Sequence, residues 1–416
     1  MYSEKSLKKI CLITPGHIST NPRLVKEAIT LLEHNYKVHI IFTQYTIRQI
    51  QEDFKILSKY PEISFDILNW SGNTYRSLIV KIISGLKQRV SSKLVKLYPI
   101  LFLKNRILNR NYNWQLSKAM MQTADLYIAH NLSALPIAII AAKKLLKKAG
   151  FDAEDFHRFE NSDDKANEMV LLNSFYEEKY MALADYLTAA SPIIAHKYQK
   201  ILKRQIPHIL NVFPQTKFIS QKRNDNKIKL FWFSQTIGPN RGLETIIESL
   251  SILEKFNLEL NLLGEIDNNY KKELADQLTM LGIANDKLIF HETISPDMIP
   301  NFAQQFDIGI ASELSTPVNR DICLTNKIFT YCQIGLAIVA SNTKAQQELI
   351  YDNPGLGFLY EQNNASSLAN LLITLCANEF ELEQAKTRSF NYAKTKFNWE
   401  LEQKKFICVL DTLWVK

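Results

Sequence analysis

The stretch "LTNKIFTYCQIGLAIVAS", residues 324–341, carries residue types that could bind an anion. Thr325 and Asn326 can cap a helix that begins here, and Lys327 adds a positive charge to the same turn. The free N–H groups and the dipole of a helix N-terminus suit a phosphate group. Gly335 would end the helix, and a β-branched strand would follow. The stretch therefore predicts a phosphate site, without naming the molecule that carries the phosphate.

Other polar and ionisable residues gather where predicted strands end. These segments are 15–23, 129–131 and 151–160 in the N-terminal half, and 234–242, 264–267, 291–293, 312–327 and 341–343 in the C-terminal half. Ligands of parallel α/β sheets bind at the carboxyl ends of the strands, so we expect the chemistry here.

Several common kinds of site are missing from the sequence. The first predicted strand is followed by the single glycine Gly16, whereas a dinucleotide site needs GxGxxG. There is no Walker lysine loop, no DxD triplet and no spaced His/Cys cluster that would suit zinc. We therefore expect no metal and no cofactor.

Apolar strands alternate with helical patterns along both halves. We expect strands at 8–14, 37–43, 63–68, 124–130, 186–191, 207–213, 228–234, 258–264, 287–292, 307–312, 337–341 and 357–360. Helices are expected at 22–34 and 135–150, the latter with Gly150 as its C-cap, and from near Gly242, Asn268, Pro296, Thr325, Lys344 and Ala365. Continuous apolar strands between helices indicate parallel sheets covered on both faces. The predicted fold class is α/β, with two doubly wound, Rossmann-like domains facing a cleft.

The length of 416 residues also favours two domains. We place an N-terminal domain at 1–213, with a basic helical insert at 75–121, and a linker at 214–227. A C-terminal domain would follow at 228–390, and then a C-terminal helix at 391–416, for which packing on the N-terminal domain is one option.

The net charge of +8 is concentrated in one region, because residues 67–124 contain ten basic side chains and no acidic one. Basic residues interleaved with apolar ones are typical of amphipathic helices on anionic membrane surfaces. A solvated helix face is an alternative, and nucleic acid is not expected because no nucleic-acid-binding motif accompanies the charge. The longest apolar run, 132–142, is too short to span a bilayer. We expect a cytoplasmic protein at the inner face of the cell membrane.

Three stretches, in order, carry a resemblance to one family. "LITPGHISTNPRLVKEAITLLEHNYKV" resembles the opening of group 1 glycosyltransferases, the family 4-like members of the GT-B superfold. "LFWFSQTIGPNRGLETIIESL" resembles the first strand, loop and helix of their donor domain, and "LTNKIFTYCQIGLAIVAS" is similar to their donor-binding helix. The resemblance implies a nucleotide-diphosphate sugar held by the C-terminal domain and an acceptor held by the N-terminal one.

The resemblance assigns donor-site roles in the C-terminal half. An arginine at a helix start can pair with a diphosphate through two parallel hydrogen bonds, and a glutamate at a strand end can meet sugar hydroxyl groups. The implied donor-binding residues are Gly16, whose backbone can approach the phosphates, Arg241, Glu265, Thr325, Asn326, Lys327 and Thr330, with Glu313 as a catalytic residue at the sugar. Glu265 could instead be an acidic residue that stabilises the start of the following helix.

In the N-terminal half the resemblance puts His130 near the transferred sugar. Asp155 and His157 are the candidates for binding the acceptor or activating its hydroxyl group. The implied acceptor-binding residues are His17, Asn21, Arg23 and Glu154.

The sequence departs from the family pattern at the nucleotide ribose. The second glutamate of the family motif E-x7-E aligns with Thr330, and the spacing from Glu313 is 17 instead of eight. The glycine-rich phosphate loop is replaced by "SQTIGPNR", which leaves Arg241 as its one cation.

The function that these features imply is a glycosyltransferase of the hexosyltransferase type. It would move a sugar to a glycan or a lipid-linked acceptor in the synthesis of surface polysaccharide or glycoconjugate, with retention as the family expectation. A GT-B nucleotide-sugar epimerase or hydrolase and a non-catalytic sugar-nucleotide-binding subunit are the alternatives.

Overall fold

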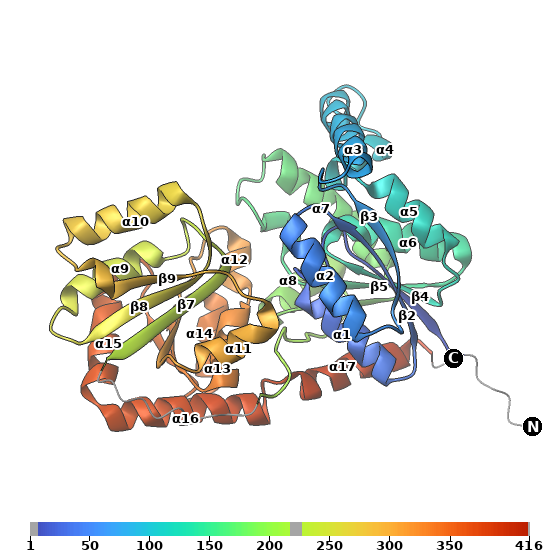
Figure 1. Cartoon of the computed structure of the whole chain (residues 1–416). Helices are drawn as coiled ribbons and strands as arrows, with labels where there is room; N and C mark the ends of the chain where they lie inside the picture. The colour runs from blue at the N-terminus through green and yellow to red at the C-terminus, as the bar shows by residue number, and fades with distance from the viewer. Residues whose placement is uncertain (1–6, 217–226, 415–416) are drawn as a thin grey trace, which may run out of the picture. The chain divides into compact units, whose positions relative to one another are not determined.

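The computed structural model of the chain describes residues 7–216 and 227–414. The chain divides into two compact units, which Figure 1 colours from blue to green and from yellow to red. The N-terminal unit runs to Ile209 and also takes the chain from Lys405 onward, and the C-terminal unit comprises Leu210–Lys404. The predicted boundary was 213, and residues 217–226 of the predicted linker lie outside the described residues.

Six parallel strands form the sheet of the N-terminal unit. They are β1 (Lys9–Ile13), β2 (Lys37–Gln44), β3 (Ser64–Asn69), β4 (Leu126–His130), β5 (Lys148–Ala153) and β6 (Tyr186–Ala189). Its α-helices are α1 (Pro22–Glu33), α2 (Ile47–Lys59), α3 (Tyr75–Leu94), α4 (Leu101–Leu108), α5 (Tyr112–Met121), α6 (Leu135–Leu145), α7 (Glu168–Tyr180) and α8 (Pro192–Leu202). The strand order β3-β2-β1-β4-β5-β6 is that of a doubly wound fold.

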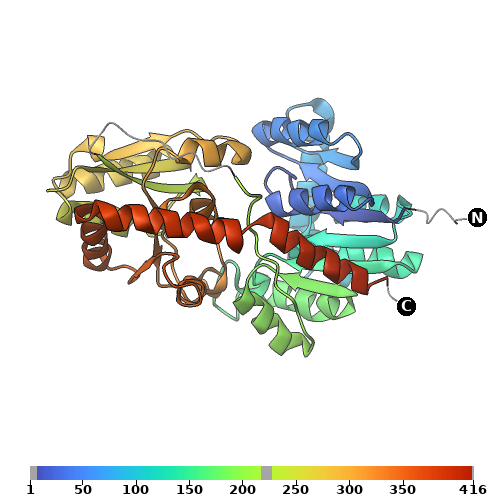
Figure 2. The same cartoon turned by 90° about the horizontal axis from the view of Figure 1, so that it is seen from below.

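The C-terminal unit repeats this topology. Its strands are β7 (Ile228–Ile237), β8 (Leu258–Ile266), β9 (Leu288–His291), β10 (Ile308–Ala311), β11 (Ala337–Ser341) and β12 (Phe358–Tyr360), in the order β12-β11-β10-β7-β8-β9. Its helices are α9 (Leu243–Ile252), α10 (Asn268–Met280), α11 (Ile299–Ala303), α12 (Val318–Ile322), α13 (Asn326–Ile334), α14 (Lys344–Tyr351), α15 (Ala365–Ala377), α16 (Glu379–Thr395) and α17 (Trp399–Thr412), the last of which continues into the N-terminal unit. Figure 2 shows α16 along one side of this unit, where it contacts α13 and β11.

The two predicted doubly wound domains are thus confirmed. In both sheets the strand order reverses between two neighbouring central strands, β1 and β4 in one and β7 and β10 in the other. Helices that connect these strands must lie on opposite faces, which leaves an opening at the carboxyl ends of the two strands. Each unit therefore has one such position, where a ligand site is expected.

Two predictions in the N-terminal half were wrong. Residues 207–213 do not form a strand and make only an isolated bridge between Ala189 and His208. The helix predicted to end at Gly150 ends at Leu145, and Gly150 lies inside β5. A Cβ atom at Gly150 would lie 1.9 Å from the ring of Tyr186, so this glycine makes room for a packed aromatic ring and does not cap a helix.

The predicted basic helical insert is confirmed by α3, α4 and α5, which together span residues 75–121. In Figure 1 α3 and α4 lie together beyond the edge strand β3. The C-terminal segment 391–416, predicted as a single helix, contains parts of two helices. The last turn of α16 ends at Thr395 and α17 begins at Trp399, so residues 396–398 separate them. No helix within the described residues is both long and apolar enough to cross a membrane.

Candidate active site

The loops after β7 and β10 are tied together at the carboxyl edge of the C-terminal sheet. The indole Nε1 of Trp232 donates to Oγ of Ser312 at 2.9 Å, and the Ser312 hydroxyl donates to the backbone oxygen of Arg241 at 2.7 Å. Gly242 follows with a φ of 73°, and a Cβ atom there would lie 3.1 Å from Cβ of Ser312. These contacts fix the backbone on which Arg241 is carried.

Two of the predicted donor-site residues meet directly. Nζ of Lys327 lies 2.5 Å from Oε1 of Glu313, and their side chains are 6% and 4% exposed. The Lys327 ammonium also lies 5.0 Å from the ring centroid of Trp232, a distance suited to a cation–π contact. The Ser341 hydroxyl accepts from the backbone N–H of Glu313 at 2.9 Å. The structure therefore unites the strand-end glutamate and the helix-start lysine in one buried ion pair.

Helix α13 begins at Asn326, as predicted, with Thr325 at the N-cap position. The Thr325 hydroxyl makes no capping hydrogen bond, and its Oγ1 is buried without a partner. The capping that we predicted for the Thr325 side chain is therefore absent. First-turn N–H groups that lack a side-chain acceptor remain available to an anion, which the helix dipole also favours.

Arg320, on α12, is a cation that the sequence analysis missed. Its Nη1 donates to the backbone oxygen of Asn240, the residue before Arg241. Burial, and after it the nearby Arg241, lower the pKa of the Arg320 guanidinium, while Glu313 opposes this change. Arg241, in the loop after β7, and Arg320, on α12, therefore lie close enough for their charges to interact, and Arg320 also feels the charge of Glu313. The short pattern "VNRDI" was the only signal for α12, and we predicted no helix between the strand at 307–312 and the helix from near Thr325.

Asp321 holds this added helix in place. Its carboxylate accepts from the Ser315 hydroxyl at 2.7 Å and from the backbone N–H of Lys344 at 3.0 Å. The Lys344 side chain, at 2.8 Å, and these hydrogen bonds lower the pKa of Asp321 against the effect of burial. The start of α14 therefore anchors α12 and, through it, Arg320.

The other two predicted donor residues have different surroundings. Thr330 lies in the buried helix α13 and is 3% exposed. Glu265 lies at the end of β8 with an exposed side chain. Within the described residues neither forms a hydrogen bond or an ion pair with Glu313 or Lys327, so their donor-binding roles stay predictions.

In the N-terminal unit His17 serves as a structural link. Its Nδ1 lies 2.6 Å from Asp53, and its Nε2 accepts from the backbone N–H groups of Tyr45 and Thr46 at 2.9 and 3.0 Å. Thr46 is the N-cap of α2, so the imidazole anchors the start of that helix. Both ring nitrogens are used and the residue is 1% exposed, which favours a structural role over the predicted binding of an acceptor.

Gly16, just before it, is half-buried. A Cβ atom there would make only ordinary contact with Tyr45, at 3.6 Å. Packing within the N-terminal unit therefore does not require a glycine at this position, and close approach by a ligand remains its predicted role.

Arg23 lies at the centre of a buried charge network. Its Nη2 donates to Asp152 at 2.8 Å, its Nη1 donates to the backbone oxygen of Ile209 at 2.5 Å, and its Nε lies 3.4 Å from Glu27. The side chain is fully buried. These bonds join α1, β5 and the segment after α8, so Arg23 holds the unit together and offers no exposed atom to the predicted acceptor.

His130 and Glu154 extend this network. Nε2 of His130 lies 3.3 Å from Glu27, and Nδ1 lies 3.5 Å from Glu154. Burial lowers the pKa of His130, but the two carboxylates outweigh burial and raise it to about 10. A protonated, fully buried imidazole is a poor general base at neutral pH. The catalytic role predicted for His130 would therefore not be that of a general base.

Asn21 joins the network through Glu154. Its Nδ2 donates to Glu154 at 3.0 Å, and its Oδ1 caps α1 by accepting from the N–H of Leu24 at 3.0 Å. Glu154 is the one member of the predicted acceptor set with a partly exposed side chain, at 16%. It is therefore the best placed of the four to meet a ligand.

His157 and Asp155 lie in the segment after β5. Nδ1 of His157 lies 3.1 Å from Glu160, and its backbone N–H donates to the Tyr198 hydroxyl at 3.0 Å. Burial lowers the pKa of His157, and Glu160 more than offsets burial, so the pKa rises to about 9. Asp155 is half-buried, and its backbone oxygen accepts from the same Tyr198 hydroxyl. Among the described residues, two groups of side chains have a spacing that could hold a metal ion. They are His130–Asp152–Glu154 and Asp155–His157–Glu160.

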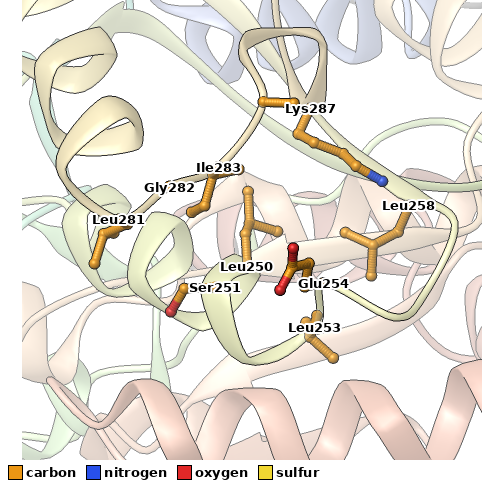
Figure 3. Close-up of a pocket in the computed structure, with 10 residues that line it drawn as sticks. Leu250, Ser251, Leu253, Glu254, Leu258, Leu281, Gly282, Ile283 and Lys287 are labelled. Carbon is orange, nitrogen blue, oxygen red and sulfur yellow. The ribbon is translucent and has the colours of Figure 1, made fainter.

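A cavity of about 220 Å³ in the C-terminal unit lies away from these residues (Figure 3). It is bounded by the end of α9, the end of α10 and the segments that enter β8 and β9, with Leu250, Ile283 and Lys287 among its lining residues. Because the amino ends of parallel strands lie opposite their carboxyl ends, this cavity is not part of the site around Glu313.

Part of the C-terminal unit matches a family of known proteins, and solved structures share the fold of the whole chain. Residues 227–378 match the family described as glycosyl transferases group 1. No curated protein sequence matches the chain. Among solved structures, Anabaena Alr3699/HepE in complex with UDP is 16% identical, with a TM-score of 0.67, and the match covers 98% of this chain and 100% of that one.

Two further structures have the same fold. Sucrose-phosphate synthase from Thermosynechococcus elongatus is 11% identical, with a TM-score of 0.68 and coverage of 98% and 99%. A putative UDP-N-acetylglucosamine 2-epimerase from Listeria monocytogenes is 10% identical, with a TM-score of 0.57 and coverage of 98% and 97%. The chain therefore has the GT-B fold of these structures, and its C-terminal unit carries a glycosyl transferases group 1 domain at residues 227–378.

Proposed function

We propose that this protein transfers a sugar from a nucleotide-diphosphate sugar to a glycan or a lipid-linked acceptor, in the synthesis of surface polysaccharide or glycoconjugate. The observation that carries the proposal is the buried ion pair of Lys327 and Glu313 at the start of α13, with Arg241 and Arg320 on the neighbouring loop and helix. Phosphate binding at helix N-termini, strengthened by arginine, is a general way to hold a diphosphate.

The same groups would stabilise the leaving diphosphate. Negative charge grows on it as the sugar–phosphate bond breaks, and we propose that the two guanidinium groups and the α13 dipole stabilise that charge. Glu313 would accept hydrogen bonds from sugar hydroxyl groups. Transfer with retention of configuration then needs no strong protein base, since the leaving diphosphate can take the acceptor proton itself.

UDP-sugars are the donors to test first, and we propose that transfer needs no metal. HepE, whose fold this chain shares, has been solved in complexes with UDP and with UDP-glucose. That likeness supports the choice of nucleotide without fixing the sugar. Arg241 and Arg320 would supply the positive charge that a divalent cation would otherwise bring to the diphosphate, since the charge of Lys327 is balanced by Glu313.

We also propose a cytoplasmic location at the inner face of the cell membrane. The acid-free stretch 67–124 supports it, because ten basic residues without acidic neighbours are attracted to anionic lipid. A lipid-linked acceptor would be met at the same surface.

The test is a binding and turnover assay of the full chain with UDP-sugars. Thermal shift first identifies the nucleotide, since a ligand of the folded state raises Tm by mass action. UDP release and product mass are then measured with and without lipid-linked acceptors. Acceptor-dependent release with a new glycoside supports transfer. Release of free sugar without acceptor, a changed sugar on intact nucleotide, or binding without turnover would identify the hydrolase, epimerase or non-catalytic binder instead.

A further inference from the structure

Helix α3 exposes its apolar side chains and buries its small polar ones. Three serines at seven-residue spacing, Ser77, Ser84 and Ser91, face inward and are 2%, 7% and 1% exposed. The outward-facing apolar side chains are Tyr75, Leu78, Ile79, Ile82, Ile83, Leu86, Val90 and Leu94, of which Leu86 is 61% exposed. A surface helix normally has the opposite polarity, with its apolar stripe toward the core. The exposed face of α3 therefore needs an apolar environment outside the N-terminal unit.

This face continues beyond α3 into α4. Leu97, Tyr98, Ile100 and Phe102 are also exposed. Together these twelve side chains, between residues 75 and 102, are close to half of the 29 large apolar side chains that are exposed in the described chain. Scattered exposed apolar residues are ordinary, but a contiguous patch of this kind marks a binding surface.

The cations on the same helices lack acidic partners. Lys87, Arg89, Arg106 and Arg110 form no ion pair within the described residues, and residues 67–124 contain no acidic side chain. Lys96 and Lys118 do pair, with Glu168 and Asp66 from outside the segment. An apolar face bordered by unpaired cations is complementary to an anionic, apolar surface.

A cavity at the base of α3 gathers three of these cations. It has a volume of about 290 Å³, and its lining includes Ile79, Ile83, Lys87, Arg106, Arg110 and Trp114. A lining that combines apolar side chains with cations suits an amphiphile that carries a phosphate group.

Arg110 is held at this cavity by specific contacts. Its Nε donates to Ser84 at 3.0 Å, and its guanidinium lies 4.1 Å from the ring centroid of Trp70. A Cβ atom at Gly85 would lie 2.9 Å from Nη2 of Arg110, so glycine gives the guanidinium room against the helix. Burial, and then Arg89, lower the pKa of Arg110, which reflects a cation with like charge beside it.

We propose that α3 and α4 dock this protein on an anionic phospholipid surface, and that the cavity lined by Lys87, Arg106 and Arg110 receives a phosphate-bearing lipid headgroup. The charge argues against a second copy of the chain on this face, because two acid-free segments would repel each other. Each basic residue near an anionic membrane contributes about 1 kcal/mol, roughly five-fold in affinity, and the apolar side chains add burial in the acyl region. The inference deepens the proposed membrane location but does not depend on sugar transfer.

The test is flotation of the full chain with phosphatidylcholine vesicles and with vesicles that also contain about 30% phosphatidylglycerol. We expect binding to the anionic vesicles only, and weaker binding at high salt. The variant Ile82→Ser/Leu86→Ser/Val90→Ser should lose at least ten-fold in affinity. Its matched control, Met280→Ser/Phe380→Ser, replaces side chains that are 83% and 72% exposed in the C-terminal unit, and it should bind like the wild type.

A second pair of variants separates the cavity from general charge. Lys87→Gln/Arg106→Gln removes two cations at the cavity, whereas Arg76→Gln/Lys93→Gln removes two exposed cations of α3 that do not line it. We expect the cavity pair to lower the affinity for short-chain phosphatidylglycerol at least five-fold more than the control pair. Inorganic phosphate serves as the second ligand, and equal binding of phosphate and lipid would assign the cavity to free phosphate and contradict the headgroup site.

Other outcomes would also overturn the inference. Equal binding to neutral and anionic vesicles, or full binding by the serine variant, contradicts docking through this face. A dimeric wild type that becomes monomeric in the serine variant, without vesicle binding, would make the face a subunit interface. UDP-induced thermal shift of each variant reports the donor site separately, so loss of docking and loss of the transferase function are distinguishable.

Discussion

Nζ of Lys327 lies 2.5 Å from Oε1 of Glu313, and this contact joins the start of α13 to the end of β10 inside the C-terminal unit. Both side chains are almost completely buried. Removing one partner of a buried pair leaves an uncompensated charge, which costs about 3–5 kcal/mol. The pair therefore contributes to the stability of the C-terminal unit, besides the role that we propose for it in the donor site.

We expect Lys327→Gln and Glu313→Gln each to lower the free energy of unfolding by that amount. The double variant should recover much of the loss, because neither charge then remains alone, but it should not recover sugar transfer. Urea unfolding measures the first effect and turnover of UDP-sugar the second. A double variant with wild-type activity would contradict the donor-site assignment.

Arg241→Gln and Arg320→Gln should weaken UDP binding with little change in Tm. Hydrogen bonds to charged groups are worth about 1.5–3 kcal/mol, which corresponds to about 10- to 100-fold in Kd. Isothermal titration calorimetry at two salt concentrations checks this. Lys272→Gln, an exposed cation of α10, is the control and should leave Kd unchanged. If Arg320→Gln behaves like this control, the guanidinium serves only to hold the loop at Asn240.

His17→Ala should destabilise the N-terminal unit. It removes the acceptor for the N–H groups of Tyr45 and Thr46 and the partner of Asp53, and unsatisfied buried groups cost about 1–3 kcal/mol each. KM for the acceptor, measured well below Tm, separates the two roles of His17. An unchanged KM with a lowered Tm supports the structural role, whereas a raised KM at wild-type Tm would restore acceptor binding.

The buried network around Arg23 should show opposing pH effects. The pKa of His130 rises from 6.5 to about 10, so its stabilising effect is complete below pH 6.5 and is lost as pH increases to 10. Burial, and then Arg23, lower the pKa of Lys26 from 10.5 to about 7, so the unfolded state holds that proton more tightly and stability increases between pH 7 and 10.5.

In the wild type, the effects of His130 and Lys26 on the free energy of unfolding cancel in part between pH 7 and 10. In His130→Gln the free energy of unfolding should therefore increase from pH 7 to 10, and in Lys26→Met it should decrease over the same range. Urea unfolding at pH 7, 8.5 and 10 measures both slopes. Equal slopes in the two variants would mean that His130 and Lys26 do not titrate as described.

Sugar transfer should persist after metal removal. The cations of the donor site are side chains, and Arg23 already pairs with Asp152 in the His130–Asp152–Glu154 group. Turnover is compared after dialysis against EDTA and after readdition of Mg²⁺ or Mn²⁺. A loss of more than about ten-fold that Mn²⁺ restores would contradict metal independence and direct attention to the two carboxylate–histidine groups.

The sequence predicted the C-terminal unit more accurately than the N-terminal one. All six C-terminal strands and the helices from Leu243, Asn268, Asn326, Lys344 and Ala365 lie where periodicity and capping residues put them. In the N-terminal unit β5 was missed, because the run from Leu135 to Gly150 has no turn residue at Leu146, where the helix ends with a non-glycine residue in the left-handed region. Pairing with β4 and β6 makes this segment a strand, and Gly150 leaves room there for the ring of Tyr186.

By itself, the sequence determined the two doubly wound units, the helix start at Asn326 and the acid-free basic segment. These follow from local periodicity and composition. Tertiary structure alone decided which polar side chains lie near one another. It placed Arg320 beside Arg241, paired Glu313 with Lys327, and turned His17 and Arg23 inward. It also turned the serines of α3 inward and its isoleucines outward. The reason is physical: burial and charge pairing depend on residues distant in sequence, and no local pattern records them.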